Sequence, residues 1–103
     1  MLNQFITFGP FHLDPRAGLA HGKRAVRLTP KALALLCYLA GNRDRVVSKD
    51  ELAAHLYPHD EERDSNVIEV LIGRLRRKLD PDGSLQPLET LRGRGYRFTL
   101  GES

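Results

Sequence analysis

The sequence predicts one α+β domain over residues 1–103, with four short antiparallel strands, three helices and a C-terminal β-hairpin. Three observations predict this order. Short β-prone runs broken by glycine and proline fill residues 4–28. Capping signals and apolar periodicity mark three helices between residues 29 and 79. Two more β-prone runs then flank a Gly-Arg-Gly turn, and a chain of 103 residues fits a single modest core.

The N-terminal sheet is predicted from its breaks. Gly9-Pro10 and Asp14-Pro15 separate the first three β-prone runs. Gly22 can adopt a positive φ and close a hairpin between the third and fourth runs. The four strands are expected at residues 5–8, 11–13, 19–20 and 25–28.

The first helix is predicted to start at Thr29-Pro30, because threonine can cap free backbone N–H groups and proline fits the first turn. Residues 32–40 are apolar almost all round, which indicates a buried helix, and Gly41 is expected to end it.

The second helix is predicted from a capping box, in which Ser48 caps forward and Glu51 reaches back to the Ser48 N–H. Leu52, Ala53 and Leu56 follow, and Pro58 ends the helix.

The third helix is predicted over residues 66–79 from one apolar face. That face consists of Ile68, Leu71, Ile72, Leu75 and Leu79. The opposite side carries Asn66, Val70, Gly73, Arg74 and Arg77. A turn over residues 80–83 precedes the expected hairpin strands 88–92 and 96–100, which Gly93-Arg94-Gly95 joins.

Composition is that of a globular domain, with 41% hydrophobic and 28% charged residues. No run approaches the ~20 apolar residues of a membrane span, and no secretory signal is apparent. The single Cys37 excludes an internal disulfide and indicates a reducing compartment. The net charge of +3 is only a weak sign of a polyanionic partner, but seven cations between Arg74 and Arg97 face three acids.

No catalytic site, metal site or cofactor is expected. Cys37 lies in the most apolar helix, where a thiol is inert. His55 and His59 have helical spacing, but Pro58 breaks the helix between them. A small hydrolase is excluded because no nucleophile–base pair is in view.

The basic third helix has two interpretations. In the first, the helix face is an ordinary solvated surface; in the second, it contacts a nucleic acid. The basic residues concerned are Arg74, Arg76 and Arg77. A shorter capped helix precedes this one, as in helix-turn-helix units, and a basic hairpin follows. Asn66 suits adenine edges, Arg74 suits guanine, and Val70 between them suits a thymine methyl group.

The hairpin tip also has two interpretations. The glycines beside Arg94 serve only the turn, or they leave Arg92 and Arg94 free to enter a groove. Tyr96 and Phe98 alternate toward the core and are expected to pack there.

Three segments together resemble the winged-helix DNA-binding domain of OmpR/PhoB-type transcriptional regulators. They are LTPKALALLCYLAGNRDRVVSKDELAAHLYP (28–58), NVIEVLIGRLRRKLD (66–80) and ETLRGRGYRF (89–98). The N-terminal pattern FITFGPFHLD also fits, so the resemblance covers residues 5–100. Their order and spacing carry the resemblance more than any one motif.

The resemblance implies a bacterial, cytoplasmic domain that binds double-stranded DNA sequence-specifically and regulates transcription, such as the effector domain of a two-component response regulator. A recognition helix at 65–79 would lie in the major groove, and a wing at 88–100 at the minor groove. In the helix, Arg74 matches the base-reading arginine, Asn66, Glu69, Val70 and Arg77 line the same helix, and Arg76 matches a DNA contact or an ion-pair residue. Thr90, Arg92 and Arg94 match wing positions, and Tyr57 matches an aromatic residue that reaches a phosphate.

The resemblance also implies further partners. The acidic loop, with Asp60, Glu61, Glu62 and Asp64, matches a segment that contacts RNA polymerase in such proteins. A second copy on tandem half-sites is another implied partner, and no membrane contact is expected. Response regulators of this kind carry a phosphoacceptor domain N-terminal to this one. In other relatives the winged helix comes first.

Two positions depart from the family pattern. Gly73 stands where relatives carry a polar or basic residue, and Leu71 replaces a polar residue. The alternative function is a winged-helix protein-interaction module that docks on RNA polymerase or a partner domain, which the acidic run supports. An interaction helix would carry aromatic residues or methionine on its outer face, whereas this helix carries Asn66 and Arg74.

Overall fold

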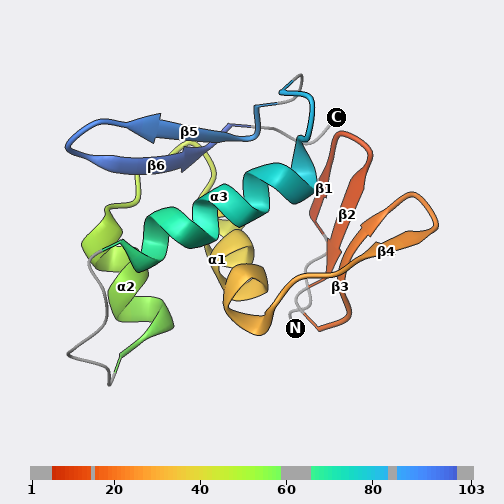
Figure 1. Ribbon diagram of the computed structural model, residues 1–103, viewed down its shortest axis with the longest axis horizontal. Coiled ribbons are helices and arrows are strands. Elements are labelled where there is room, and N and C mark those ends of the chain that lie inside the picture. Colours follow the sequence, from red (N-terminus) through yellow and green to blue (C-terminus); the bar gives the residue numbers. More distant parts are fainter. Residues whose placement is uncertain (1–5, 15, 59–65, 84–85, 100–103) are drawn as a thin grey trace.

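The computed structural model describes residues 6–14, 16–58, 66–83 and 86–99. It has the predicted order of a four-stranded antiparallel sheet, three helices and a C-terminal hairpin (Figure 1). The elements are β1 (Ile6–Phe8), β2 (Phe11–Asp14), β3 (Gly18–His21), β4 (Arg24–Val26), α1 (Pro30–Gly41), α2 (Lys49–Leu56), α3 (Val67–Leu79), β5 (Leu88–Leu91) and β6 (Gly95–Phe98).

The N-terminal sheet has the order β1-β2-β3-β4, and each strand is antiparallel to the next. Gly22 closes the β3–β4 hairpin with a φ of 62°, as its position predicts. The last strand ends at Val26, two residues earlier than expected. Arg27 and Leu28 therefore form a linker to α1.

The predicted caps of α1 are largely confirmed. The Ala32 N–H donates to the Thr29 hydroxyl at 3.2 Å, and proline occupies the first turn. The expectation that Gly41 ends the helix needs one correction, because Gly41 is the last helical residue and Asn42 is the cap. The Asn42 side-chain amide donates to the Tyr38 carbonyl at 2.7 Å and so satisfies one of the free carbonyls at the helix end.

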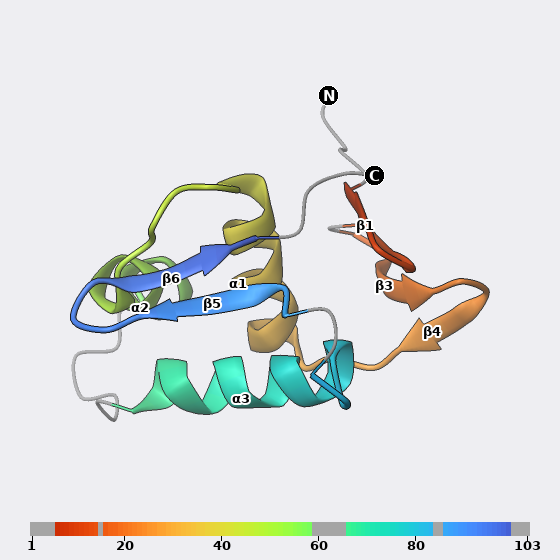
Figure 2. The same ribbon diagram turned by 90° about the horizontal axis from the view of Figure 1, so that it is seen from above.

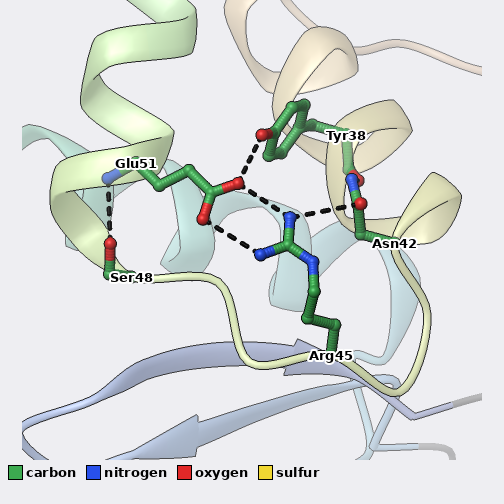
Figure 3. A network of polar contacts seen from close by, with 5 residues as sticks. All are labelled: Tyr38, Asn42, Arg45, Ser48 and Glu51. Carbon is green, nitrogen blue, oxygen red and sulfur yellow. Dashed lines mark hydrogen bonds and ion pairs between the residues drawn. The ribbon is translucent and has the colours of Figure 1, made fainter.

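The capping box of α2 is only half formed. Ser48 accepts the Glu51 N–H at 3.0 Å, as predicted. The Glu51 carboxylate does not reach back; it accepts hydrogen bonds from the Tyr38 hydroxyl and from both terminal nitrogens of Arg45 (Figure 3). A cationic donor offers a carboxylate a stronger, charge-assisted bond than a backbone N–H does. These partners lower the pKa of Glu51 from 4.5 to about 2.

One core joins the sheet, the helices and the hairpin. The Phe8 ring of β1 meets the Phe98 ring of β6 edge to face, with centroids 5.0 Å apart. α1 lies between the other elements and contributes buried leucines, among them Leu35, Leu36 and Leu39. The predicted apolar face of α3 is confirmed, because all of its side chains are at most 4% exposed: Ile68, Leu71, Ile72, Leu75 and Leu79.

The hairpin is held by a third segment. Val47, between α1 and α2, exchanges two backbone hydrogen bonds with Tyr96 of β6, at 2.8 and 2.9 Å. A Cβ on Gly95 would lie 2.1 Å from the Val47 carbonyl oxygen. Gly93 has a φ of 74° in the turn. Gly93 thus serves the turn, and Gly95 allows the close approach of Val47.

The elements are arranged so that α3 and the hairpin run alongside each other (Figure 2). The hairpin tip, α2 and the start of α3 gather at the end farthest from the N-terminal sheet in both views.

Candidate nucleic-acid interface

The outward face of α3 is the first part of the site. Val70 is 42% exposed and is the one large hydrophobic side chain exposed in the described part of the chain. Asn66 precedes the helix as its N-cap residue and makes no capping bond with its side chain, so its amide remains available. The exposed residues on this face are Asn66, Glu69, Val70, Arg74 and Arg77. They share a face because they recur at helical spacing.

Lys49 of α2 neutralises the acid on this face. Its ammonium lies 2.6 Å from the Glu69 carboxylate. The hydrogen bond to Lys49 lowers the pKa of Glu69, and the pKa of Lys49 is raised in return. α3 therefore presents its arginines without an unpaired carboxylate in their midst.

The hairpin supplies the second part of the site. Thr90, Arg92 and Arg94 are all exposed. Residues 90–96 of the hairpin share a groove with the start of α2 and with Glu69 of α3. The hairpin tip and the first turn of α3 thus lie side by side, while Arg74 lies further along the helix.

The described cations differ in whether they form an ion pair. Arg45, Lys49 and Arg97 each form an ion pair with a glutamate at 2.6–2.7 Å. The cations of the outward face and of the hairpin tip form no such pair with any described residue: Arg74, Arg77, Arg92 and Arg94. α3 and the hairpin tip therefore carry positive charge that no described acid pairs with.

Arg76 bonds to the hairpin within the domain. Its side chain is half-buried, and Nη2 donates to the Leu88 carbonyl at 2.9 Å and to the Thr90 hydroxyl at 2.7 Å. The family resemblance implies either a DNA contact or an ion pair for Arg76; within the domain, these hydrogen bonds hold the hairpin against α3, and Arg76 forms no ion pair with a described residue. A DNA contact from Arg76 or Thr90 stays a prediction.

Tyr57 follows α2 as its C-cap residue and is half-buried. The ammonium of Lys31 lies 4.4 Å from the centre of the Tyr57 ring and also donates to the Leu56 carbonyl. This contact places a cation beside the tyrosine that the family resemblance assigns to a phosphate. That assignment stays a prediction.

The other residues that the sequence analysis considered do not form a reactive site among the described residues. Cys37 is half-buried, and burial raises the pKa of its thiol, which disfavours the reactive thiolate. The rings of His55 and Tyr38 lie tilted at 33° to each other, with centroids 4.2 Å apart. His59 and the acidic loop, Asp60, Glu61, Glu62 and Asp64, lie outside the described residues. None of the helices in the described part of the chain combines the length and apolar character needed to cross a membrane.

Sequence reasoning missed Lys49 and Arg27. Lys49 meets Glu69 across 20 positions, and no local pattern signals such a pair. The sequence pattern places Arg27 in a strand, yet it lines a hollow beside Arg74 and Arg77. Because β4 ends at Val26, Arg27 belongs to the linker between β4 and α1, which the sequence pattern did not indicate.

Three comparisons relate this geometry to known proteins. Residues 22–98 match the family described as "Transcriptional regulatory protein, C terminal". The chain is 48% identical over 95 residues to the two-component response regulator PhoP of Pseudomonas aeruginosa, covering 91% of this chain and 42% of that protein. It therefore spans less than half the length of this relative.

Solved structures share the fold. The DNA-binding domain of Klebsiella pneumoniae RstA, crystallised in complex with the RstA box, has a TM-score of 0.79 and 28% identity, with 93% of this chain and 97% of that chain covered. The DNA-binding domain of Escherichia coli CpxR has a TM-score of 0.81 and 27% identity, with 97% and 99% covered. The chain belongs to the family of C-terminal domains of transcriptional regulatory proteins, the winged-helix family of OmpR/PhoB type.

Proposed function

We propose that this domain binds double-stranded DNA sequence-specifically and regulates transcription, with α3 in the major groove and the β5–β6 hairpin at the minor groove. The observation that carries the proposal is the outward face of α3, where Asn66, Val70 and Arg74 are exposed together. The RstA relative was crystallised with its DNA box, which supports the same partner here.

The chemistry of this face suits base edges. An α-helix fits the major groove, which is about 12 Å wide. Arg74 can donate two hydrogen bonds to guanine, Asn66 can pair with adenine, and Val70 can contact a thymine methyl group. Arg77 lies one turn beyond Gly73 on the same face, where it can reach a phosphate.

The hairpin suits the minor groove. Its tip exposes Arg92 and Arg94 without acidic partners among the described residues. Arginine is favoured in a narrow minor groove because the negative potential there is enhanced. Arg76 fixes the hairpin relative to α3 through Leu88 and Thr90, so both elements meet the duplex at a set spacing.

In this proposal, the domain acts on DNA in the cytoplasm of a bacterial cell. It has no catalytic role. The family it belongs to consists of transcription regulators and not of enzymes. An interaction module is less well supported, because the α3 face exposes no aromatic residue and no methionine beside Val70.

Selection from a pool of random duplexes tests the proposal, followed by binding titrations on the enriched site. We expect a defined motif, and Arg74→Ala should weaken binding to it by about 1–3 kcal/mol and relax the preference at one base pair. Arg16→Ala removes the same charge from the exposed β2–β3 turn and should leave the preference unchanged. Enrichment of no motif would contradict sequence-specific binding.

Arg94→Ala tests the hairpin separately. It should lower the affinity for all duplexes more evenly and reduce the slope of log K against log salt by about 1 if Arg94 neutralises a phosphate. An affinity that stays unchanged at several salt concentrations would remove the hairpin from the interface.

A further inference from the structure

We propose that a hollow between the β4–α1 linker and the last turns of α3 binds a backbone phosphate of the DNA, with Arg27 as its principal contact. This adds a third contact region to α3 and the hairpin, and it rests on the DNA binding proposed above. Neither sequence motifs nor the family resemblance assigns a role to Arg27.

The hollow is built by two segments that are distant in the sequence. The chain leaves β4 at Val26 and passes alongside the C-terminal half of α3 before it enters α1 (Figure 1). The lining residues are Arg27, Leu28, Thr29, Ala32, Arg74, Arg77 and Lys78.

The hollow is strongly cationic. Four of its lining side chains carry a positive charge and none carries a negative one: Arg27, Arg74, Arg77 and Lys78. None of the four has an ion pair or hydrogen-bond partner among the described residues. The first turn of α1, which borders the hollow, also lacks acidic residues. Like charges gathered without counter-charge repel one another, and a bound anion relieves that repulsion.

The position of the hollow identifies the anion. Arg74 belongs both to the outward face of α3 and to the lining of the hollow. A helix that reads bases in the major groove has a phosphate backbone on either side of it, so the phosphates flanking the Arg74 contact are the nearest anions to the hollow. Arg27 is exposed and extends the cationic surface from α3 onto the linker.

The other cations of this region do not form such a site. Arg24, three residues earlier in β4, lines a different hollow together with Asp80 and Asp82. Two carboxylates there disfavour an anion. Arg24 therefore serves as a matched control of the same residue type, three residues away at the start of β4.

Duplex titrations at several salt concentrations test the proposal with Arg27→Gln and Arg24→Gln, on the site selected by the unmodified domain. Arg27→Gln should weaken binding about three- to tenfold at low salt and reduce the slope of log K against log salt by about 0.9, the share of one phosphate. Selection with this variant should return the same motif. Arg24→Gln should match the unmodified domain in both affinity and slope.

The phosphate that occupies the hollow could come from the DNA backbone or from free inorganic phosphate. Titration of the unmodified domain and of Arg27→Gln with inorganic phosphate, at constant ionic strength, distinguishes these two sources. If the unmodified domain binds DNA but Arg27→Gln changes neither affinity nor slope, the hollow is not a DNA contact, even where inorganic phosphate binds it. If the unmodified domain binds no duplex, the proposed function fails and this inference fails with it. Thermal unfolding of both variants checks that they are folded.

Discussion

The Arg76 guanidinium of α3 lies 2.7 Å from the Thr90 hydroxyl of β5, and the same nitrogen lies 2.9 Å from the Leu88 carbonyl oxygen. This contact joins the proposed reading helix to the hairpin. It uses Nη2 of Arg76, while no described residue accepts a hydrogen bond from Nη1 or Nε.

Arg76→Ala should lower the free energy of unfolding by about 1–3 kcal/mol, because the part-buried Leu88 carbonyl oxygen loses its hydrogen-bond donor. Thr90→Val removes only the hydroxyl and should cost less. Urea denaturation of both variants and of the double variant gives their coupling energy, which we expect to exceed about 0.5 kcal/mol. Additive effects on stability, together with a loss of DNA affinity in Arg76→Ala alone, would instead favour a direct contact.

Gly95→Ala should destabilise the domain by about 3 kcal/mol or more, since the new Cβ would lie 2.1 Å from the Val47 carbonyl oxygen and the φ of 142° is unfavourable for alanine. Gly93→Ala, two residues earlier, meets no atom within 4 Å and should cost only about 1 kcal/mol through its φ of 74°. Thermal unfolding compares the two. Equal losses would mean that the approach of Val47 does not constrain Gly95.

Gly73→Ala should stabilise the domain by about 0.5–1 kcal/mol, because glycine in a helix interior is less favourable than alanine. The structure leaves room for the methyl group, since a Cβ at this position would have the Arg77 Nη1 as its nearest neighbour, at 3.9 Å. Chemical denaturation measures the gain. A loss of stability would show that this position of α3 is more crowded than its surroundings indicate.

Acid should destabilise the domain partly through Glu51. The pKa of Glu51 is depressed from 4.5 to about 2 by Arg45 first and Tyr38 second, so its contribution is present above pH about 4.5 and is lost as the pH falls toward 2. Unfolding measured between pH 7 and 2 should show a shallower acid loss in Glu51→Gln than in the unmodified domain. Asp50→Asn is the control, because Asp50 makes no hydrogen bond or ion pair with any described residue. A parallel profile for Glu51→Gln would exclude this contribution.

The acidic loop is expected to contact a basic protein surface, that of RNA polymerase. Replacing Asp60, Glu61, Glu62 and Asp64 by serine should leave DNA binding equal or slightly stronger, because negative charge near DNA is repelled. Transcription activation by the full-length regulator should fall. Activation that survives the four changes at normal protein levels would make the loop ordinary solvated surface.

Much of the fold could be predicted from local patterns. The period of α3 set its buried face, and the Thr29 and Ser48 caps set two helix starts, because these signals act within one or two turns of the chain. Exposure of Val70 and Arg74 followed from the same period. These two residues of the candidate site could therefore be identified from the sequence alone.

What escaped prediction depends on segments that meet only in the fold. The local pattern assigns Glu51 to its own cap, but Arg45 and Tyr38 reach it from outside α2. A turn considered alone leaves the second glycine of the hairpin free, but Val47 requires it. Lys49 meets Glu69, and Arg76 meets Thr90, across 20 and 14 positions. Such contacts leave no periodic signal in the sequence.

The hydrogen bonds that Val47 and Arg76 make along the hairpin also limit its pairing with strands of other molecules. A two-stranded ribbon normally presents unpaired backbone groups that invite a strand from another molecule. Here Val47 occupies the β6 side at Tyr96, and the Arg76 side chain caps the β5 side at the Leu88 carbonyl. The ribbon therefore offers fewer free backbone groups to a strand of another molecule at these two points.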